Sequence, residues 1–193
     1  MFLLLKSLDM RFLRIIESVF YMHVYRIISL GNIKCRLRKP HLISGNDIVI
    51  SHKTFIEKGA WIVSHRGSKG IRVGVGCMIH RNVHLDSSVG LSIEQDVLIA
   101  EGVYISDNTH NYRDIDTPIK EQLILPVKKT VIGAGTWIGQ DAKVIGAEIG
   151  KNCVIGANSI VNQDIPDYCV VAGAPARIIK QYNLKTKKWE RIF

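Results

Sequence analysis

Residues 93–105 read Ile-Glu-Gln-Asp-Val-Leu-Ile-Ala-Glu-Gly-Val-Tyr-Ile, and this short stretch contains the repeat that decides the fold. An isoleucine opens it and recurs six and twelve residues later. Three places after the first two isoleucines come Asp96 and Gly102, residue types that tolerate a left-handed backbone. A small valine follows each of these two residues. Three features therefore share one period and one phase.

The same period runs from residue 50 to residue 161. A period of six matches neither the roughly 3.6 residues of a helical turn nor the alternation of a flat strand. It predicts a short strand with its large aliphatic side chain inward, followed by a sharp corner. The aliphatic positions are Ile50, Ile56, Ile62, Val73, Ile79, Leu85, Ile93, Ile99, Ile105, Ile132, Ile138, Val144, Ile149, Ile155 and Val161. The corner positions are Gly59, Gly76, Asn82, Asp96, Gly102, Gly135, Asp141, Asn152 and Asn158.

Three such sides close one coil, and successive coils stack at the spacing of neighbouring strands, about 4.8 Å. The predicted fold class is all-β: a parallel β-helix of about five coils over residues 41–175. One long excursion, residues 106–130, interrupts the repeat. We expect an amphipathic helix and a linker in residues 1–40, and a basic tail with a short helix in residues 176–193. These segments are the candidates to cover the open sheet edges of the coil.

The net charge of +9 is concentrated at the two ends of the chain. Residues 1–40 carry eight Lys/Arg against two acidic residues, and residues 176–193 carry six against one. A nucleic-acid-binding domain places its positive charge on the folded platform that contacts the backbone, so nucleic acid is not an expected partner. Basic ends instead suit an anionic membrane surface or a phosphorylated small molecule. The pattern of residues 1–30 leaves open whether the helix packs on the coil or lies on a membrane.

The 193-residue chain has no apolar run near the ~18 residues of a membrane-spanning helix. It also shows no signal-peptide pattern. Cys35, Cys77, Cys153 and Cys169 form no C-x-x-C pair, so reduced thiols and a cytoplasmic location are expected. A location at the inner face of the cell membrane is left open.

The long excursion is where we expect the chemistry, because a coil interior filled with aliphatic side chains holds no ligand. It is dense in polar groups and carries His110 near its beginning. A histidine can accept and return a proton at neutral pH, which an enzyme that activates a hydroxyl or an amine requires. From the residues alone, His110 is equally consistent with a surface histidine of a polar loop.

A more specific pattern lies in the C-terminal part of the repeat. The chain reads Ile-Gly-Ala-Gly-Thr-Trp-Ile-Gly from residue 132, Ile-Gly-Ala-Asn-Ser-Ile-Val from residue 155 and Val-Ala-Gly-Ala-Pro-Ala-Arg from residue 171. With the histidine five places after Ile105, this pattern resembles the hexapeptide-repeat acetyltransferases. It is nearest to the maltose/galactoside O-acetyltransferases and to the O-acetyltransferases of lipopolysaccharide and capsule synthesis. The resemblance covers about residues 70–180.

The resemblance implies a left-handed coil, a homotrimer, and an acetyl-CoA site in the cleft between neighbouring subunits, with no metal required. His110 matches the family's catalytic base, which takes the proton of the acceptor hydroxyl as its oxygen attacks the thioester. Asp86, Asp107 or a backbone carbonyl would fix the tautomer of the ring.

The acceptor side is less well defined. His80, Asn82, Asp107 and Tyr112 are the candidates to bind a sugar. His80 stands where the sugar O-acetyltransferases have an asparagine, so either His80 takes over that role or the acceptor differs. Asn82 is already explained as a corner residue.

Five positions match contacts that the family makes with acetyl-CoA. Trp137 matches an aromatic residue that lines the pantetheine cleft; the alternative is a surface tryptophan at a corner or a trimer contact. Gly139 and Ala157 match positions whose backbone pairs with the pantetheine arm, although corner geometry alone would account for them. Arg177 and Lys180 match basic residues that meet the phosphates, although they also fit a solvated basic tail.

The predicted function is acetyl-CoA-dependent O-acetylation of a sugar hydroxyl, in a surface polysaccharide or its precursor. The alternative is N-acetylation of a nucleotide-linked amino sugar. Relatives of that kind often carry a preceding Rossmann-like domain, for which the 49 residues before the coil leave no room. A γ-type carbonic anhydrase is disfavoured, because Glu101 and Ser106 stand in place of its paired zinc-binding histidines. A non-enzymatic trimeric scaffold is the third interpretation.

Overall fold

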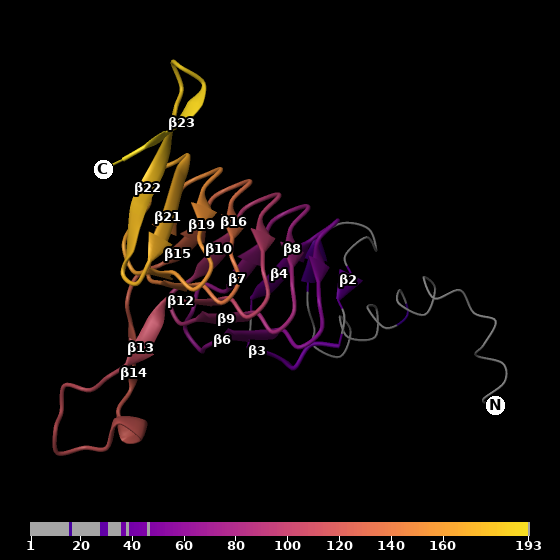
Figure 1. Ribbon diagram of the computed structural model, residues 1–193. Coiled ribbons are helices and arrows are strands. Elements are labelled where there is room, and N and C mark those ends of the chain that lie inside the picture. The colour runs from indigo at the N-terminus through magenta and orange to yellow at the C-terminus, as the bar shows by residue number, and fades with distance from the viewer. Residues whose placement is uncertain (1–15, 17–27, 31–35, 38, 46, 193) are drawn as a thin grey trace.

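The computed structural model describes residues 16, 28–30, 36–37, 39–45 and 47–192. Its strands form a parallel β-helix whose coils stack in chain order, with the C-terminal strands at one end (Figure 1). The fold class is confirmed. The predicted N-terminal amphipathic helix falls almost wholly outside the described residues.

Three parallel sheets form the sides of the coil, and we call them the first, second and third faces. The first face contains β1 (Ile28–Leu30), β4 (Ile48–Ser51), β7 (Ile71–Val73), β10 (Leu91–Ile93), β15 (Thr130–Ile132) and β18 (Glu148–Ile149). The second contains β2 (Arg36–Leu37), β5 (Phe55–Ile56), β8 (Met78–Ile79), β11 (Leu98–Ile99), β16 (Trp137–Ile138), β19 (Val154–Ile155) and β21 (Cys169–Gly173). The third contains β3 (Leu42–Gly45), β6 (Trp61–Ser64), β9 (His84–Ser87), β12 (Tyr104–Ser106), β17 (Lys143–Ile145) and β20 (Ile160–Val161).

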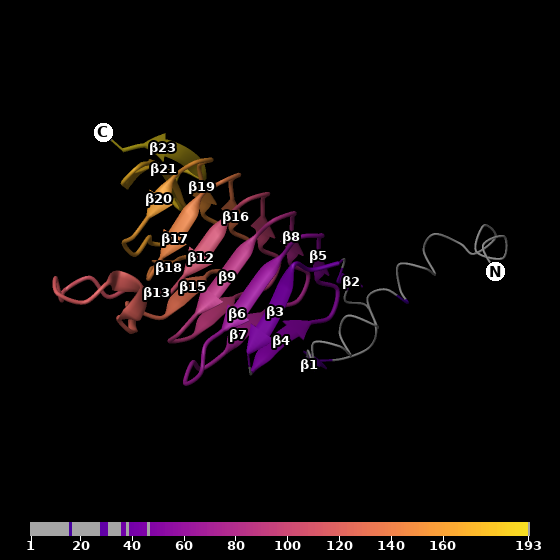
Figure 2. The same cartoon turned by 90° about the horizontal axis from the view of Figure 1, so that it is seen from below.

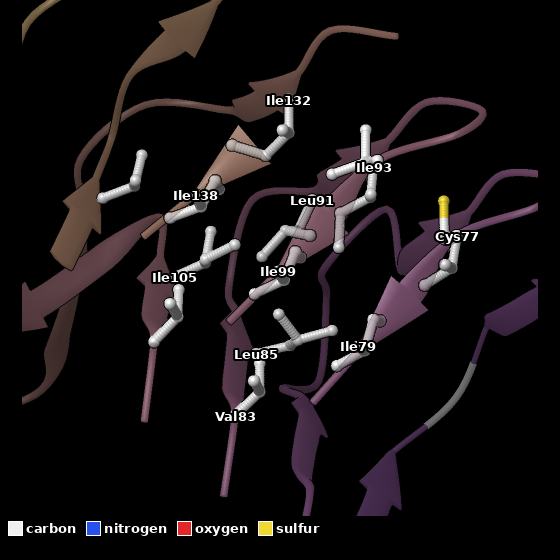
Figure 3. Close-up of a cluster of buried hydrophobic side chains, with 14 of the residues drawn as sticks. Cys77, Ile79, Val83, Leu85, Leu91, Ile93, Ile99, Ile105, Ile132 and Ile138 are labelled. Atoms are coloured by element: carbon white, nitrogen blue, oxygen red, sulfur yellow. The ribbon is translucent and has the colours of Figure 1, made fainter. Parts of the chain in front are cut away.

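The interior of the coil is filled by the repeat. All fifteen predicted aliphatic positions are at most 2% exposed. Figure 3 shows part of this interior, where aliphatic side chains of successive coils cluster together. All nine predicted corner residues adopt φ values between 50° and 80°. Successive corners also fit one another, since a Cβ added to Gly59 would lie 2.2 Å from Oδ1 of Asn82 in the next coil. Small polar side chains close the remaining gaps; for example, the Thr54 hydroxyl donates to the Gly74 carbonyl at 2.7 Å.

The predicted excursion is confirmed as a projection from the coil. It leaves β12 on the third face and returns at β15 on the first face, so it emerges from the edge where these two faces meet. Its root is an antiparallel hairpin of β13 (Asn108–His110) and β14 (Ile124–Pro126), and a 3-10 helix, η2 (Ile119–Glu121), lies farther out. Figure 2 shows this segment standing away from the stacked coils.

Two expectations about the ends of the fold need correction. The strands form six coils rather than five, because β1, β2 and β3 pair in parallel with β4, β5 and β6. The predicted C-terminal helix is wrong, since β22 (Ala176–Asn183) and β23 (Lys188–Arg191) form an antiparallel hairpin there. The open edge of β21 explains the difference: β22 satisfies its backbone groups by antiparallel pairing, which a helix would leave unpaired. The tail does cover a coil end, as predicted.

The described cysteines are interior residues. Cys77, Cys153 and Cys169 are free thiols and are buried. Burial raises the pKa of the Cys153 thiol to about 11, so it stays protonated and unreactive at neutral pH. Among the described residues, no helix has the length and hydropathy needed to cross a bilayer.

The fold makes a direct prediction about stability. In β7, Ile71 is fully buried inside the coil, whereas its neighbour Arg72 is exposed on the first face. Ile71→Ala should lower the free energy of unfolding by about 2–5 kcal/mol, because it leaves a cavity in a packed interior. Urea denaturation measures the loss, with Arg72→Ala as the matched control that should change it by less than about 0.5 kcal/mol. Equal losses for the two variants would contradict the assignment of inward and outward positions.

Candidate functional site

His110 is the last residue of β13 and is exposed on the excursion. The strand holds it opposite Ile124 of β14, so its backbone position is fixed by the hairpin rather than by a loose loop. Within the described part of the chain, its ring makes no hydrogen bond and no ion pair. An exposed imidazole on an ordered strand can accept a proton from a bound hydroxyl. Tyr112, two residues farther on, is 70% exposed.

Asp107 anchors the excursion to the coil. It is fully buried, and its carboxylate accepts four hydrogen bonds from the end of the preceding coil. The donors are the Ser87 hydroxyl at 2.8 Å and the backbone N–H groups of Ser88 at 2.6 Å, Val89 at 3.1 Å and Gly90 at 2.7 Å. Both oxygens are therefore committed, and the side chain reaches neither the surface nor the ring of His110. The expectation that Asp107 contacts the acceptor is corrected accordingly: it holds the base of the excursion.

Asp86 belongs to a polar cluster at the root of the excursion. Its Oδ1 lies 2.9 Å from Nε2 of His65 and accepts a hydrogen bond of 2.9 Å from the Asn108 side-chain amide. We call these three residues the Asp86 cluster. They come from three successive coils, and His65 and Asp86 are partly exposed. Asn108 and His110 project to the same side of β13, because strand side chains alternate. Asp86 thus connects the coil to the strand of His110, without a hydrogen bond to the ring of His110.

Sequence reasoning missed His65 and the aromatic side chains beside it. Trp61, His84 and Tyr104 stand in register on β6, β9 and β12, and all three point outward from the third face. The sequence contained a signal for these three aromatic residues. Each one directly precedes an inward-facing aliphatic residue, and the three occupy the same face in three consecutive coils. The position directly before an inward aliphatic residue faces outward in this repeat, so aromatic residues that recur at this position predict a column of rings on the surface.

The second face carries a different column. Phe55, Met78, Leu98, Trp137 and Val154 lie in register on consecutive strands and face outward. Met78 is 44% exposed, Leu98 37% and Trp137 48%. We call this set the apolar column. Exposed apolar side chains in a continuous row are typical of a surface that contacts a ligand or another protein.

The apolar column leads to basic residues at the C-terminal end of the coil. The register continues through Val170 of β21 to Lys180 of β22 and Arg191 of β23. Lys180 and Arg191 therefore project on the side of the apolar column. Arg177 is exposed on β22, and its guanidinium donates to the Ala176 carbonyl at 2.9 Å. An elongated ligand with an apolar arm and an anionic end would find matching chemistry along this face.

The remaining candidates lie at the corner between the second and third faces. The backbone N–H of His80 donates to Ile99 and that of Gly139 donates to Ile155, so both groups hold coils together. A Cβ added to Gly139 would lie 2.7 Å from the backbone nitrogen of Ala157, so close approach of two coils explains this glycine. Ala157 is exposed at the next coil. Asn82 has φ of 56° and is a corner residue.

These positions fall into two groups within one chain. His110, the Asp86 cluster and Asp107 lie at the edge between the third and first faces. Trp137 lies on the second face, which is the side of the prism opposite that edge. Within one chain, an imidazole on that edge therefore cannot reach a ligand that is bound on the opposite face.

A further cavity is lined mainly by acidic residues, in contrast to the basic residues at the end of the second face. A groove of about 500 Å³ on the first face is bordered by Glu94, Glu148, Asp164 and Asp167, with Lys151 as its one lining cation. Most of these carboxylates are already paired: Lys128 lies 3.5 Å from Glu148 and 2.6 Å from Asp164, and Lys151 lies 3.6 Å from Asp167. The described residues contain no group of three or more His, Cys, Asp or Glu side chains arranged to hold a metal ion.

The chain is similar in sequence to several acetyltransferases. Residues 129–163 match the family model "Hexapeptide repeat of succinyl-transferase". WbbJ of Escherichia coli (strain K12), named for O-acetyl transfer in lipopolysaccharide biosynthesis, is 40% identical over 116 residues, which are 56% of this chain and 59% of WbbJ. Rv3034c of Mycobacterium tuberculosis (strain H37Rv), named as an acetyltransferase, is 33% identical over 178 residues, which are 82% of this chain and 57% of Rv3034c.

The solved structures include a galactoside acetyltransferase in complex with coenzyme A. It is 30% identical to this chain and superposes with a TM-score of 0.54, over 70% of this chain and 68% of that protein. The chain spans somewhat more than half the length of the two curated relatives that it matches.

The anchoring role of Asp107 is testable. Asp107→Ala leaves the buried N–H of Gly90 and the partly buried N–H groups of Ser88 and Val89 without an acceptor, and should lower the free energy of unfolding by about 3 kcal/mol or more. Asp107→Asn keeps one acceptor oxygen and should give a smaller loss. Urea denaturation measures both, and midpoints equal to that of the wild type would show that the carboxylate does not hold the excursion.

Proposed function

This chain belongs to the hexapeptide-repeat acetyltransferase family, and on that premise we propose that it transfers the acetyl group of acetyl-CoA to a sugar hydroxyl. The acceptor is a sugar of a surface polysaccharide or its precursor. The names of WbbJ and of the galactoside acetyltransferase support oxygen transfer and a sugar acceptor. The observation that carries the proposal is His110, an exposed imidazole held on an anchored hairpin.

His110 acts as the general base. Its ring takes the proton of the acceptor hydroxyl while the hydroxyl oxygen forms a bond to the thioester carbonyl carbon. The carbon–sulfur bond then breaks, and the imidazolium returns its proton to the departing sulfur. No acyl-enzyme is needed. Asp107 supports this step indirectly, because it fixes the root of the hairpin that carries the ring.

The second face binds acetyl-CoA. The apolar column offers a surface for the pantetheine arm, and Trp137 is its most exposed member. Arg177 and Lys180 bind the phosphates, since exposed cations on a strand end suit anionic oxygens. Gly139 and Ala157 border this surface at the corner of two coils. His80 and Asn82 lie at the same corner, nearer to the start of the coil.

The complete site requires more than one copy. His110 of one chain lies on the edge opposite its own apolar column, so a neighbouring copy supplies the face that binds acetyl-CoA. Cyclic assembly of three chains closes such head-to-tail contacts and leaves equivalent sites at each interface. We therefore propose a homotrimer in which aliphatic parts of the apolar column, such as Met78 and Leu98, contact the adjoining subunit.

His110→Ala should lower kcat by about 10²–10⁴-fold, the usual contribution of a general base. Its affinity for acetyl-CoA should stay near that of the wild type, because the ring is not placed among the acetyl-CoA contacts. The assay follows release of the free thiol of CoA with a panel of sugars and amino sugars, and isothermal calorimetry measures binding. His52→Ala is the matched control and should retain full turnover. Undiminished turnover in His110→Ala would remove this residue from the mechanism.

The phosphate contact gives a separate prediction. Lys180→Ala should raise the KM for acetyl-CoA by roughly tenfold, because it deletes one charge-assisted contact. Lys185→Ala, an equally charged change at the exposed turn of the same hairpin, should leave that KM unaltered. If both variants raise the KM alike, the effect comes from overall charge and not from a contact at Lys180.

A further inference from the structure

The third face bears a row of aromatic rings that the proposed chemistry does not use: one pair is stacked, the next is tilted by 38° and the last meets edge to face at 65°. The rings of His41 and Trp61 are stacked, with centroids 4.9 Å apart and planes inclined by 20°. Trp61 and His84 follow at 5.5 Å, and His84 and Tyr104 at 6.3 Å. Because strands of successive coils are about 4.8 Å apart, four rings extend over roughly 14 Å. We call this row the aromatic column.

The environment of His84 in the aromatic column favours its neutral form. Burial lowers the pKa of the His84 ring, and the nearby His41 and Lys143 lower it further, against an opposing effect of Asp86. His84 is therefore neutral at neutral pH, which suits stacking against an apolar surface. Trp61 and Tyr104 are half-buried, so their rings are supported by neighbours and present a face to solvent.

Hydrogen-bonding groups lie directly beside the rings. Asp86 stands two residues after His84 on the same face of β9, so the Asp86 cluster forms a polar border to the aromatic column. Both hydrogen bonds of the cluster to Asp86 go to Oδ1. No hydrogen bond from the described residues reaches Oδ2, which leaves an acceptor oxygen for an outside hydroxyl. The cluster is also the part of this face that adjoins β13 and His110.

We propose that the third face is the binding platform for the acceptor glycan, and that the acceptor is a neutral oligosaccharide rather than a single sugar. Sugar rings present apolar C–H surfaces, which stack on the aromatic column. Their hydroxyl edges bind the Asp86 cluster, which leads the chain of sugars toward His110. A row of roughly 14 Å exceeds the length of one hexose. The carboxylate of Asp86 disfavours an acidic sugar, since like charges repel.

This inference rests on the proposed function for the identity of the reaction, but the binding platform has its own support in the geometry. A second copy of the chain is the rival occupant of the third face. The apolar column of the second face is the better protein contact, because its members are mainly aliphatic. The third face combines a row of aromatic rings with an acceptor oxygen of Asp86, which is the chemistry that a sugar requires.

The test compares short and long acceptors on the full-length protein. A panel of neutral hexoses is offered, each as its methyl glycoside and as its linear tetrasaccharide, in calorimetric binding and in acetyl transfer. For the wild type, at least one tetrasaccharide should bind about tenfold more tightly than its methyl glycoside. Trp61→Ala should abolish that gain, whereas Trp61→Phe should keep most of it. Ile160→Ala, an exposed position on the same face beyond Lys143, is the control and should keep the gain.

The outcomes separate the two proposals. The platform is overturned if no hexose gains from chain length, if the gain survives Trp61→Ala, or if Trp61→Ala lowers the particle mass in light scattering and so identifies an interface between copies. If no acceptor of any length consumes acetyl-CoA, yet the length-dependent binding disappears in Trp61→Ala, the platform stands and the proposed function fails. If the methyl glycosides are acetylated but the length of the acceptor has no effect on binding, the proposed function stands and the platform fails.

Discussion

The pairing of each coil with the coils before and after it is the constraint on which the rest of the molecule depends. Every strand of the three faces hydrogen-bonds to a strand one coil away, so residues at the same phase are held in register. One inward aliphatic position on each side of each coil fills the interior, and its neighbours must point outward. A six-residue repeat therefore determines both the core and the surface. Outward side chains form columns, and each column gives its face one chemical character.

Function follows from how these columns are distributed. The second face is apolar and ends in cations, the third is aromatic with a polar border, and the first carries an acidic groove. The excursion is the one long departure from the repeat among the described residues, and the buried carboxylate of Asp107 connects it to the coil. Because the excursion emerges opposite the second face, a catalytic group and a ligand bound on that face meet only where two copies adjoin.

The sequence allowed the coil to be predicted almost completely, because each position of the repeat has its own physical demand. The repeat predicted that Ile99 is buried and that Asp96 has a positive φ, and the structure shows both. The first coil escaped prediction because its strands precede the clear repeat. The C-terminal strands escaped it because their structure is set by the open edge of β21, a tertiary effect that local propensity does not contain.

The candidate site was only partly predictable from the sequence. His110 was proposed from its place on the excursion and stays a prediction, but Asp107 was assigned to the acceptor side although it is buried as an anchor. The pairing of His65 with Asp86 joins residues of different coils, so only the register of the coils reveals it. A repeat gives the phase of each residue, and contacts between loops and coils need the three-dimensional structure.

The central claim is that each active site is assembled from two copies, and complementation tests it most directly. His110→Ala and Trp137→Asp should each be inactive alone, the first for want of a base and the second for want of an acetyl-CoA surface. Unfolding and refolding the two variants together in equal amounts should restore about a quarter of the wild-type turnover, because random ring assembly places an intact His110 against an intact second face at that frequency. If the mixture stays inactive while the wild type recovers under the same treatment, the two residues act within one chain and the account is contradicted.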